Sequence, residues 1–425
     1  MKSLLFNEIQ KYADRAVVRF HMPGHSGEKT DALYASAPYD ITELPFSDNL
    51  QNPTGIIKEA EERAATAYGG RHALYLTQGA TAALFCAIGA SAGRGDKVLV
   101  ERACHKSVYS AVRFFGLKAE YVYPDFDENG IPLALTARKA EEAIDRHPDA
   151  VAFIFNACNY FGRAADAQAA EAAKAAGMTV IADQAHGAHY PFYDNLPDGF
   201  SETADFCAVS LHKTLGVYTG GALLIVNNEG LYDKTCSLRA DLHTTSPSYL
   251  VMASMDKAVC DMYNEGRKTY AEIEKTVKEF KKNSNIVFAE NDDFTRLVTL
   301  GLEKNKLAAA NIEKEAQWGD ADVFILTPSN YKKIELLKNC AGGQLRSGRR
   351  PYLPLPVKGV AGDRYEFVDL EKAEGRTAYK EAGIYPPGIP AVAYGEKITA
   401  DILKLFSENE VFGLVNGKIC VIIDK

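Results

Sequence analysis

The 425-residue chain lacks several features that mark special classes of protein. It contains one tryptophan, no apolar run of about 18 residues, no internal repeat and no low-complexity tract. An acidic residue, Glu8, interrupts the N-terminal stretch before a secretory apolar segment develops. The composition, 47% hydrophobic and 24% charged, is typical of a folded globular chain. We therefore expect a cytoplasmic protein with no membrane partner.

The eight cysteines follow no metal-binding or disulfide pattern. They are scattered along the chain, and no two have the C-x-x-C spacing of zinc knuckles or redox pairs. Because disulfides are rare in cytoplasmic proteins, we expect all eight to be reduced and no metal to be bound. The formal charge of −8 argues against a nucleic-acid partner and suits a cationic small-molecule substrate.

Strand and helix patterns alternate through the first part of the chain. A helical pattern from Gly55 to Tyr68 ends at Gly69-Gly70, a typical helix stop. Near-continuous apolar strands then alternate with helices, which predicts an α/β fold with a mostly parallel sheet sandwiched by helices. The predicted strands are 73–77, 97–101, 119–123, 150–155, 178–182, 205–210 and 220–226, and the predicted helices are 80–92, 105–115, 136–146 and 165–176.

The pattern changes near residue 258. A long amphipathic helix over 257–283 is predicted as a connector. The shorter elements predicted beyond it are strands at 286–289, 295–302, 323–327, 364–368 and 418–423, helices at 308–316, 331–338 and 397–408, and a Gly-, Arg- and Pro-rich loop at 342–362. We divide the chain into an N-terminal arm (1–55), a large domain (56–257) and a connector helix with a smaller α+β domain (258–425).

Two predicted strands end in residues that suit a pyridoxal phosphate site. One delivers Ser210, His212 and Lys213 into a loop, where partial desolvation would lower the lysine pKa and free its amine to form a Schiff base. On its own, a loop lysine is usually a surface residue. Another strand ends before Asp183, whose carboxylate could keep a pyridine nitrogen protonated and so make the ring an electron sink. Together they predict pyridoxal 5′-phosphate as the cofactor.

Further candidates follow other predicted strands. The turn Gly79-Ala80-Thr81 opens a helix whose exposed N–H groups could bind the cofactor phosphate, although an ordinary N-cap turn would look the same. His105 could stack on the cofactor ring and act as an acid or base, or it could simply begin a helix. Because ligands of open α/β sheets bind beyond the carboxyl ends of the strands, we expect these residues to lie close together.

The residues after Asp183 allow a second interpretation. Asp183, His186 and His189 form a D-x-x-H-x-x-H pattern, which a divalent metal could use. A metal there would leave Lys213 without a role, so we favour the cofactor. Ala185 would then be small because the cofactor ring lies over it.

Taken together, these stretches resemble one family, the bacterial lysine/ornithine/arginine decarboxylases in their shorter form, which have the aspartate-aminotransferase fold (fold-type I). The resemblance runs from residue 21 to about 396 and covers nearly the whole chain. Its matching stretches are 21–25 (HMPGH), 40–50 (DITELPFSDNL), 102–108 (RACHKSV), 183–189 (DQAHGAH), 210–215 (SLHKTL), 244–250 (TTSPSYL) and 385–390 (YPPGIP).

The resemblance implies roles for these residues. Lys213 would be the Schiff-base lysine, Asp183 would contact the pyridine nitrogen, and His105 would stack on the ring. The full cofactor-binding set is then Gly79, Ala80, Thr81, His105, Asp183, Ala185, His186, Ser210, His212 and Lys213. The implied reaction is decarboxylation of lysine, ornithine or arginine to an amine and CO₂, as in polyamine biosynthesis. The implied assembly is a homodimer or higher homo-oligomer with active sites between subunits.

Three acidic residues are candidates for binding the distal cation of the substrate: Glu43, Asp48 and Glu396. They lie in family-like stretches outside the cofactor set, and Glu43 and Asp48 are expected to complete the pocket of a neighbouring subunit. Turn capping or pairing with lysines is the alternative for each.

Departures from the family pattern leave the identity of the basic amino acid open. Ala80 stands where the family usually has serine, Gln184 stands where it has glutamate, and the loop 158–162 differs from the usual Pro-Thr-Tyr-x-Gly. Transamination and aldol-type cleavage are alternative reactions on the same fold, and a non-catalytic regulatory homologue is the alternative from another class.

Overall fold

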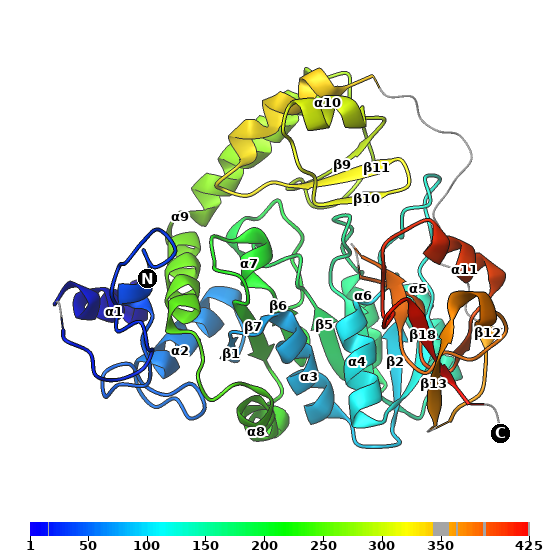
Figure 1. Ribbon diagram of the computed structural model, residues 1–425, viewed down its shortest axis with the longest axis horizontal. Coiled ribbons are helices and arrows are strands. Elements are labelled where there is room, and N and C mark those ends of the chain that lie inside the picture. The colour runs from blue at the N-terminus through cyan, green and yellow to red at the C-terminus, as the bar shows by residue number, and fades with distance from the viewer. Residues whose placement is uncertain (16, 343–356, 363, 386–387, 424–425) are drawn as a thin grey trace.

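A seven-stranded sheet forms the centre of the computed structural model, which describes residues 1–15, 17–342, 357–362, 364–385 and 388–423 (Figure 1). Its strand order is β1-β7-β6-β5-β4-β2-β3; β6, β5, β4, β2 and β3 are parallel, and β7 is antiparallel to both neighbours. The strands are β1 (His72–Leu76), β2 (Lys97–Glu101), β3 (Lys118–Val122), β4 (Ala150–Asn156), β5 (Thr179–Asp183), β6 (Phe206–Val209) and β7 (Ala222–Val226). The predicted mostly parallel sheet is confirmed.

Helices bury both faces of this sheet, which explains why its strands are apolar almost throughout. Along β1, Leu74 and Leu76 face one buried cluster, whereas Ala73 and Tyr75 face the other. The first cluster is covered by α3 (Gly79–Ser91), α4 (Lys106–Phe115) and α8 (Tyr232–Leu242). The second is covered by α2 (Ile56–Tyr68), α5 (Ala137–Arg146), α6 (Ala167–Ala175) and α9 (Tyr249–Lys282).

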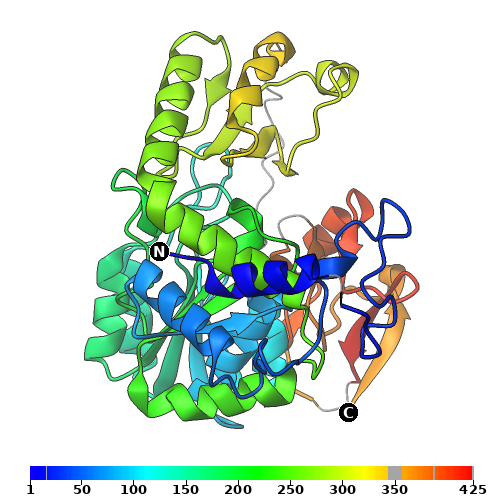
Figure 2. The same ribbon diagram turned by 90° about the vertical axis from the view of Figure 1, so that its left-hand side faces the viewer.

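The N-terminal arm contains a helix that the sequence interpretation missed. In α1 (Leu4–Asp14), the side chains of Leu5, Ile9 and Tyr12 are buried, and the helix lies along α9 (Figure 2). Their i, i+4, i+7 spacing is a helix signal. The Pro- and Gly-containing turns that follow this helix are typical of irregular structure, which is why the sequence indicated an irregular arm.

The long helix α9 begins earlier than predicted. The Ser248 side chain accepts a hydrogen bond from the backbone N–H of Val251 and so caps the helix at its start. The predicted domain boundary between residues 257 and 258 therefore falls inside α9. The chain passes from the large domain to the next unit without a break in the helix.

A four-stranded antiparallel sheet follows α9 and lies beside its C-terminal half (Figure 1). It consists of β8 (Val287–Phe288), β9 (Arg296–Leu300), β10 (Ala316–Trp318) and β11 (Ala321–Ile325), and is accompanied by α10 (Lys304–Ala309) and the 3₁₀ helix η4 (Tyr331–Cys340). The helix predicted over 308–316 is wrong, because α10 ends at Ala309 and β10 begins at Ala316.

Residues 357–422 form a second unit with its own buried cluster, which lies beside the β2–β3 side of the large sheet (Figure 1). Its elements are β12 (Val357–Lys358), β13 (Tyr365–Asp369), β14 (Ala382–Ile384), β15 (Pro390–Val392), β16 (Glu396–Lys397), α11 (Ala400–Ser407), β17 (Val411–Phe412) and β18 (Lys418–Ile422). All of its strand pairs are antiparallel within the part that the structure describes. Most of the predicted loop 342–362 lies outside the described residues. Among the helices that are described, none is long and apolar enough to cross a bilayer.

Candidate active site

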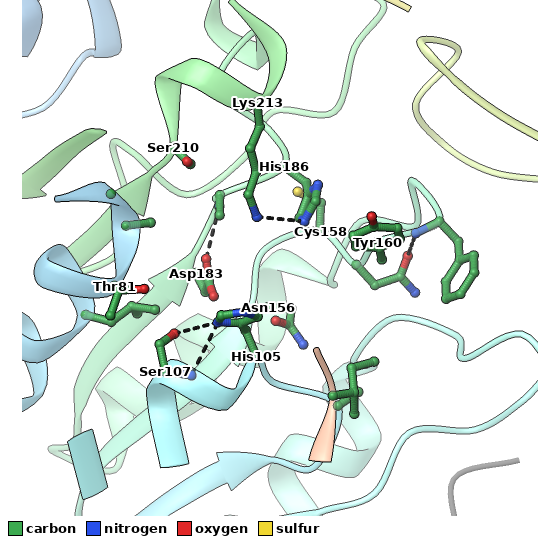
Figure 3. Close-up of a pocket in the computed structure, with 18 of the residues that line it drawn as sticks. Thr81, His105, Ser107, Asn156, Cys158, Tyr160, Asp183, His186, Ser210 and Lys213 are labelled. Atoms are coloured by element: carbon green, nitrogen blue, oxygen red, sulfur yellow. Dashed lines mark hydrogen bonds between the residues drawn. The ribbon is translucent and has the colours of Figure 1, made fainter. Parts of the chain in front are cut away.

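A cavity lies at the carboxyl ends of the central parallel strands (Figure 3). Asn156 ends β4, Asp183 ends β5 and Ser210 follows β6, and all three line the cavity. The ten residues predicted to bind the cofactor all line this cavity as well: Gly79, Ala80, Thr81, His105, Asp183, Ala185, His186, Ser210, His212 and Lys213. The strand topology therefore brings together side chains from distant parts of the sequence.

Lys213 lies on α7 (Leu211–Thr214), a single helical turn that β6 positions at the cavity. Its Nζ is 3.1 Å from Nε2 of His186. Burial lowers the pKa of the Lys213 amine, and the positive charge of Arg296 lowers it further, whereas the charge of Asp183 acts in the opposite direction. The amine is therefore more readily available in its neutral, nucleophilic form than that of a surface lysine.

Asp183 places a buried carboxyl group across the cavity from this lysine (Figure 3). Its Oδ1 accepts a hydrogen bond of 3.0 Å from the backbone N–H of Ala185. Burial raises the pKa of the Asp183 carboxyl, and the positive charge of Lys213 partly opposes this. A protonated pyridine nitrogen would stabilise the charged carboxylate, so this group suits a pyridoxal ring.

The opposite end of the cavity suits a phosphate. Gly79 begins α3 with φ of 74°, and a Cβ at this position would meet no atom within 4 Å, so the helix start is open. The Thr81 and Ser210 side chains line the same space. His212 lies there too, and its Nδ1 donates a hydrogen bond of 3.1 Å to the carbonyl of Gly221. A helix N-terminus with hydroxyl groups nearby is a favourable place for an anion.

The position of His105 is compatible with both alternatives that the sequence left open. It is the N-cap of α4, where Nδ1 accepts a hydrogen bond of 3.3 Å from the backbone N–H of Ser107, and its ring also lines the cavity. Burial and the nearby charge of Lys213 lower the pKa of His105 to about 3, so the ring is neutral. A Cβ on Gly388 would lie 3.0 Å from His105 Nε2. The C-terminal unit can therefore approach this ring so closely because position 388 has no side chain.

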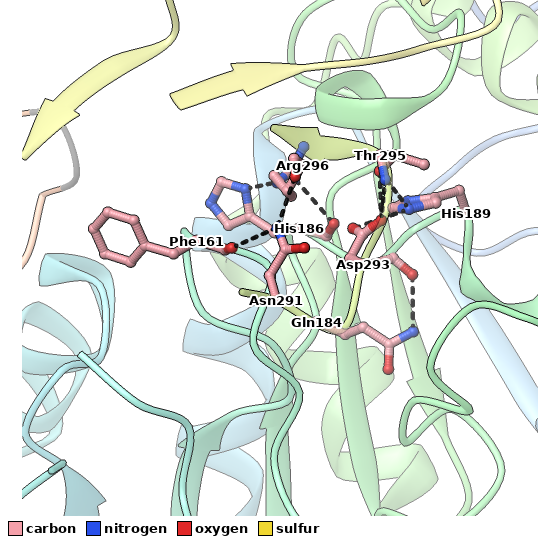
Figure 4. Close-up of polar contacts among 9 residues, drawn as sticks. Phe161, Gln184, His186, His189, Asn291, Asp293, Thr295 and Arg296 are labelled. Atoms are coloured by element: carbon pink, nitrogen blue, oxygen red, sulfur yellow. Dashed lines mark hydrogen bonds and ion pairs between the residues drawn. The ribbon is translucent and has the colours of Figure 1, made fainter. Parts of the chain in front are cut away.

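The two histidines of the D-x-x-H-x-x-H pattern point to different partners (Figure 4). His186 contacts Lys213 and Arg296. His189 instead pairs with Asp293 at 3.2 Å and lies outside the cavity lining. Within the described ranges, no three His, Cys, Asp or Glu side chains converge as a metal site would require.

The three acids predicted to bind the substrate cation do not line this cavity. Both carboxylate oxygens of Asp48 accept backbone N–H groups, including those of Gly55 (2.8 Å) and Ile57 (3.1 Å), at the start of α2. Glu43 accepts a hydrogen bond of 2.7 Å from the hydroxyl of its neighbour Thr42. Glu396 is buried in an ion pair of 3.0 Å with Arg102. A role for any of them toward substrate stays a prediction.

Sequence reasoning missed several residues of the site. Asn156 could have been found, because it is a polar residue at the carboxyl end of a predicted strand. Tyr160, which lines the cavity, lies in the atypical 158–162 loop. Arg296 and Glu315 do not line the cavity but contact its lining residues His186 and Tyr160; they come from the four-stranded sheet unit, and no local pattern connects them with Lys213.

The fold and the cavity together define a class of protein. A mostly parallel sheet that carries a desolvated lysine after one strand, a buried aspartate at the end of its neighbour and an open helix start is the arrangement of a fold-type I pyridoxal phosphate enzyme. The model of the family described as "Orn/Lys/Arg decarboxylase, major domain" matches residues 3–320, and the model of its "C-terminal domain" matches residues 357–413. The chain belongs to the Orn/Lys/Arg decarboxylase family and is a pyridoxal phosphate-dependent decarboxylase of basic amino acids.

Similar proteins agree with this assignment. An arginine decarboxylase from Bacillus cereus is 35% identical over 95% of this chain and 98% of the relative. An arginine decarboxylase from Bacillus subtilis is 31% identical over 96% of this chain and 94% of the relative. Among solved structures, lysine decarboxylase A from Pseudomonas aeruginosa has a TM-score of 0.77 at 17% identity, covering 98% of this chain and 80% of its own, which shows a shared fold.

Proposed function

We propose that the protein decarboxylates arginine to agmatine and CO₂, with pyridoxal phosphate linked to Lys213. The observation that carries the site assignment is that the desolvated Lys213 amine and the buried Asp183 carboxyl face one cavity. The choice of arginine rests on the relatives: four of them bear the name arginine decarboxylase and are 30–35% identical over almost their whole length.

The cavity residues divide the work of the reaction. When bound, pyridoxal phosphate supplies the electron sink that lets the bond between Cα and the carboxylate break. Lys213 would hold the cofactor through its amine, whose lowered pKa favours the nucleophilic form, and Asp183 would keep a proton on the ring nitrogen. His105, neutral at physiological pH, is placed to give or take a proton at the reacting carbon through Nε2. Tyr385 and Ile389 of the C-terminal unit help to enclose the cavity and exclude water.

The distal guanidinium of arginine requires an acidic partner, and among the acids that the structure describes we assign this role to Glu315. Its Oε1 accepts a hydrogen bond of 2.5 Å from the hydroxyl of Tyr160, which lines the cavity. The charge of Glu315 also reaches Lys213, where it acts to raise the pKa of the amine. Glu315 is exposed and lies outside the cavity lining, but its contact with Tyr160 brings it near the cavity, where we expect the far end of a long substrate to project.

Two measurements test this function. Borohydride should fix the cofactor to one peptide of the purified protein, and that peptide should contain Lys213; a labelled peptide without Lys213 contradicts the assignment. With arginine, lysine and ornithine offered separately, CO₂ and agmatine should form fastest from arginine, with no keto acid required. A keto-acid requirement would indicate transamination instead, and a labelled protein that releases no CO₂ from any of the three would indicate a regulatory homologue.

The substrate-charge assignment is tested with an uncharged analogue. Glu315→Gln should raise KM for arginine by up to about fivefold, because a solvent-exposed ion pair contributes at most about 1 kcal/mol. Binding of citrulline, which has almost the same shape as arginine but no charge, should be unchanged in a competition assay. Glu43→Gln is the matched variant for the earlier candidate, and an effect confined to that variant would place the cation site in a neighbouring subunit.

A homodimer with active sites between subunits also fits the molecule. Large apolar side chains of the N-terminal arm are exposed in the single chain: Val18 (77%), Phe20 (99%) and Leu33 (81%). A groove lined by Phe6, Tyr39, Leu215 and Tyr218 lies next to the arm, and Leu215 and Tyr218 closely follow Lys213 in the sequence. Sedimentation should give twice the mass of one chain, and Phe20→Asp with Leu33→Asp should shift it toward the monomer. The eight free cysteines fit the cytoplasmic location that we propose.

A further inference from the structure

The two ring nitrogens of His186 are bound by different parts of the chain. Nε2 is 3.1 Å from Nζ of Lys213 on α7 (Figure 3). Nδ1 is 3.1 Å from Nη2 of Arg296, the first residue of β9, and the same Nη2 is 3.1 Å from the carbonyl oxygen of His186 (Figure 4). The imidazole of His186 thus bridges the cofactor lysine and the four-stranded sheet unit.

The chemistry of these groups determines where the protons lie. A guanidinium only donates hydrogen bonds, so Nδ1 of His186 must accept from Arg296. The single proton of a neutral imidazole is then on Nε2, which faces Lys213. Because Nε2–H is a donor, Nζ of Lys213 must accept, and only a neutral amine has the lone pair to do so.

We propose that Arg296 is a positioning residue that fixes the proton of His186 on Nε2, and that this N–H holds the free Lys213 side chain as a neutral amine directed into the cavity. The inference rests on the proposed role of Lys213 as the lysine that links the cofactor. It assigns no contact between Arg296 and the cofactor, because Arg296 acts through His186.

Packing holds the Arg296 side chain in place. It is 1% exposed, and its Cβ packs against Gly162, where an added Cβ would come within 2.8 Å. The Asn291 side chain donates to the carbonyl oxygens of Arg296 (2.6 Å) and Phe161 (3.2 Å), which ties the start of β9 to the loop after β4. With two contacts from one guanidinium nitrogen, the His186 ring cannot rotate without losing a buried hydrogen bond.

The charges around His186 favour the same protonation state. Burial lowers the pKa of His186 well below its usual range, and the positive charges of Lys213 and Arg296 lower it further. Further titratable groups near His186 are His105 at the start of α4, His189 after β5 and Tyr160, whose ring centroid lies 4.8 Å away. The carboxylates of Asp183 and Glu315 act on the neighbouring Lys213, and among the described contacts neither forms a hydrogen bond or an ion pair with His186 that would stabilise an imidazolium there.

The second histidine of the same motif shows the opposite arrangement. The Thr295 hydroxyl donates a hydrogen bond to Asp293, so it accepts one of 3.0 Å from His189 Nε2, and this ring nitrogen also lies 3.2 Å from the Asp293 carboxylate. Asp293 and Arg296 stand three residues apart on one segment. That segment therefore gives each histidine a different partner, an acid for His189 and a donor for His186.

Nitrogen-15 NMR of the histidine rings in the apoprotein tests the proton positions directly. The His186 signal is identified by its absence in His186→Gln, and in the wild-type protein it should show a proton on Nε2. Arg296→Met removes the donor and should shift His186 toward a proton on Nδ1. Arg296→Lys keeps a donor and should retain the wild-type signal.

The rate at which the apoprotein takes up pyridoxal phosphate gives a second readout. If Nε2–H no longer supports the neutral amine, the pKa of Lys213 rises, and each unit lowers the neutral fraction about tenfold at neutral pH. Arg296→Met should therefore take up the cofactor about tenfold more slowly near pH 7 and recover at high pH. The double variant Arg239→Met with Glu61→Met, which removes another buried arginine together with the carboxylate that pairs with it, should show the wild-type pH profile.

Three results would overturn the proposal: a wild-type proton on Nδ1, an unchanged His186 signal in Arg296→Met, or a raised KM for arginine in that variant with normal cofactor uptake. The last would assign Arg296 to the substrate. If Arg296→Met does not fold, the wild-type spectrum and Arg296→Lys still decide the tautomer. Failure of the borohydride label to reach Lys213 would reject the proposed cofactor linkage and leave the proton positions to be judged separately.

Discussion

Two buried arginines each join a later unit of the chain to the large domain, but their surroundings differ. Arg102, just after β2, donates to both carboxylate oxygens of Glu396, to the Tyr109 hydroxyl at 3.1 Å and to the carbonyl of Pro390 at 2.6 Å. These contacts attach the C-terminal unit. Arg296 attaches the four-stranded sheet unit, yet its partner at the cavity is a neutral imidazole.

The two guanidinium groups also differ in how fully their N–H donors are hydrogen-bonded. Burial acts to lower the pKa of Arg102, but the negative charge of Glu396 and the surrounding tyrosine hydroxyls raise it overall. Nη1 of Arg296, in contrast, finds no hydrogen-bond partner among the described residues. Native proteins leave few buried donors unpaired, and those that remain unpaired often mark functional sites. We therefore interpret the contacts of Arg102 with Glu396 as structural, holding the C-terminal unit on the large domain. We interpret the contacts of Arg296 with His186 as part of the active site.

The largest effect that this comparison predicts is at the active-site cluster. Lys213→Ala should reduce kcat by on the order of 10⁴ or more, because it removes the nucleophile on which the other groups act. Its thermal unfolding should change little. Single-turnover CO₂ release measures the first effect and calorimetry the second, and residual activity within about a hundredfold of wild type would refute the role of Lys213.

Changes to the Arg102–Glu396 pair should instead affect stability more than activity. Glu396→Gln leaves the buried Arg102 charge uncompensated and should lower the free energy of unfolding by about 3–5 kcal/mol, with KM for arginine unchanged. Replacing both residues with methionine should recover most of that loss. Urea denaturation with a parallel activity assay distinguishes the two roles, since a large rise in KM would support the predicted role of Glu396 in substrate binding.

Asp183→Asn tests the second member of the active-site cluster. Loss of one preorganised charge should lower kcat by on the order of 10²–10³, because the ring nitrogen would no longer keep its proton. Circular dichroism should be unchanged. Turnover close to wild type would mean that the Asp183 carboxyl does not act on the cofactor.

A buried acid beside the cavity predicts a pH effect on stability. Burial raises the pKa of Glu101 to about 7 from its usual 4.5, and its Oε2 accepts a hydrogen bond of 2.8 Å from the backbone N–H of Asn156. Between these values the folded state binds more protons than the unfolded state. The free energy of unfolding should therefore fall as the pH rises from 4.5 to 7, by up to about 3 kcal/mol.

Glu101→Gln should remove that pH dependence. Urea melts of the apoprotein at pH 5 and pH 8 measure it, with the exposed Glu142→Gln as the matched control. An identical difference between the two pH values in wild type and Glu101→Gln would show that this acid does not hold its proton.

The sequence by itself determined the large sheet and the cofactor end of the site. Each strand repeats an apolar pattern that only a buried sheet satisfies, and polar residues such as Asp183 and Ser210 directly follow those runs. Parallel strands end at the same edge of a sheet, so polar residues that follow such strands in the sequence come together at that edge. Local capping signals also fixed α2 and α4 to within a residue.

Only the tertiary structure decided the partners of that site. Arg296, Glu315 and Gly388 come from units whose short strands carry weak patterns, and their approach depends on how those units pack on the large domain. The same holds for the buried ion pair of Glu396 with Arg102, which no local pattern predicted. Contacts between residues that are distant in sequence depend on packing and leave no local periodicity to read.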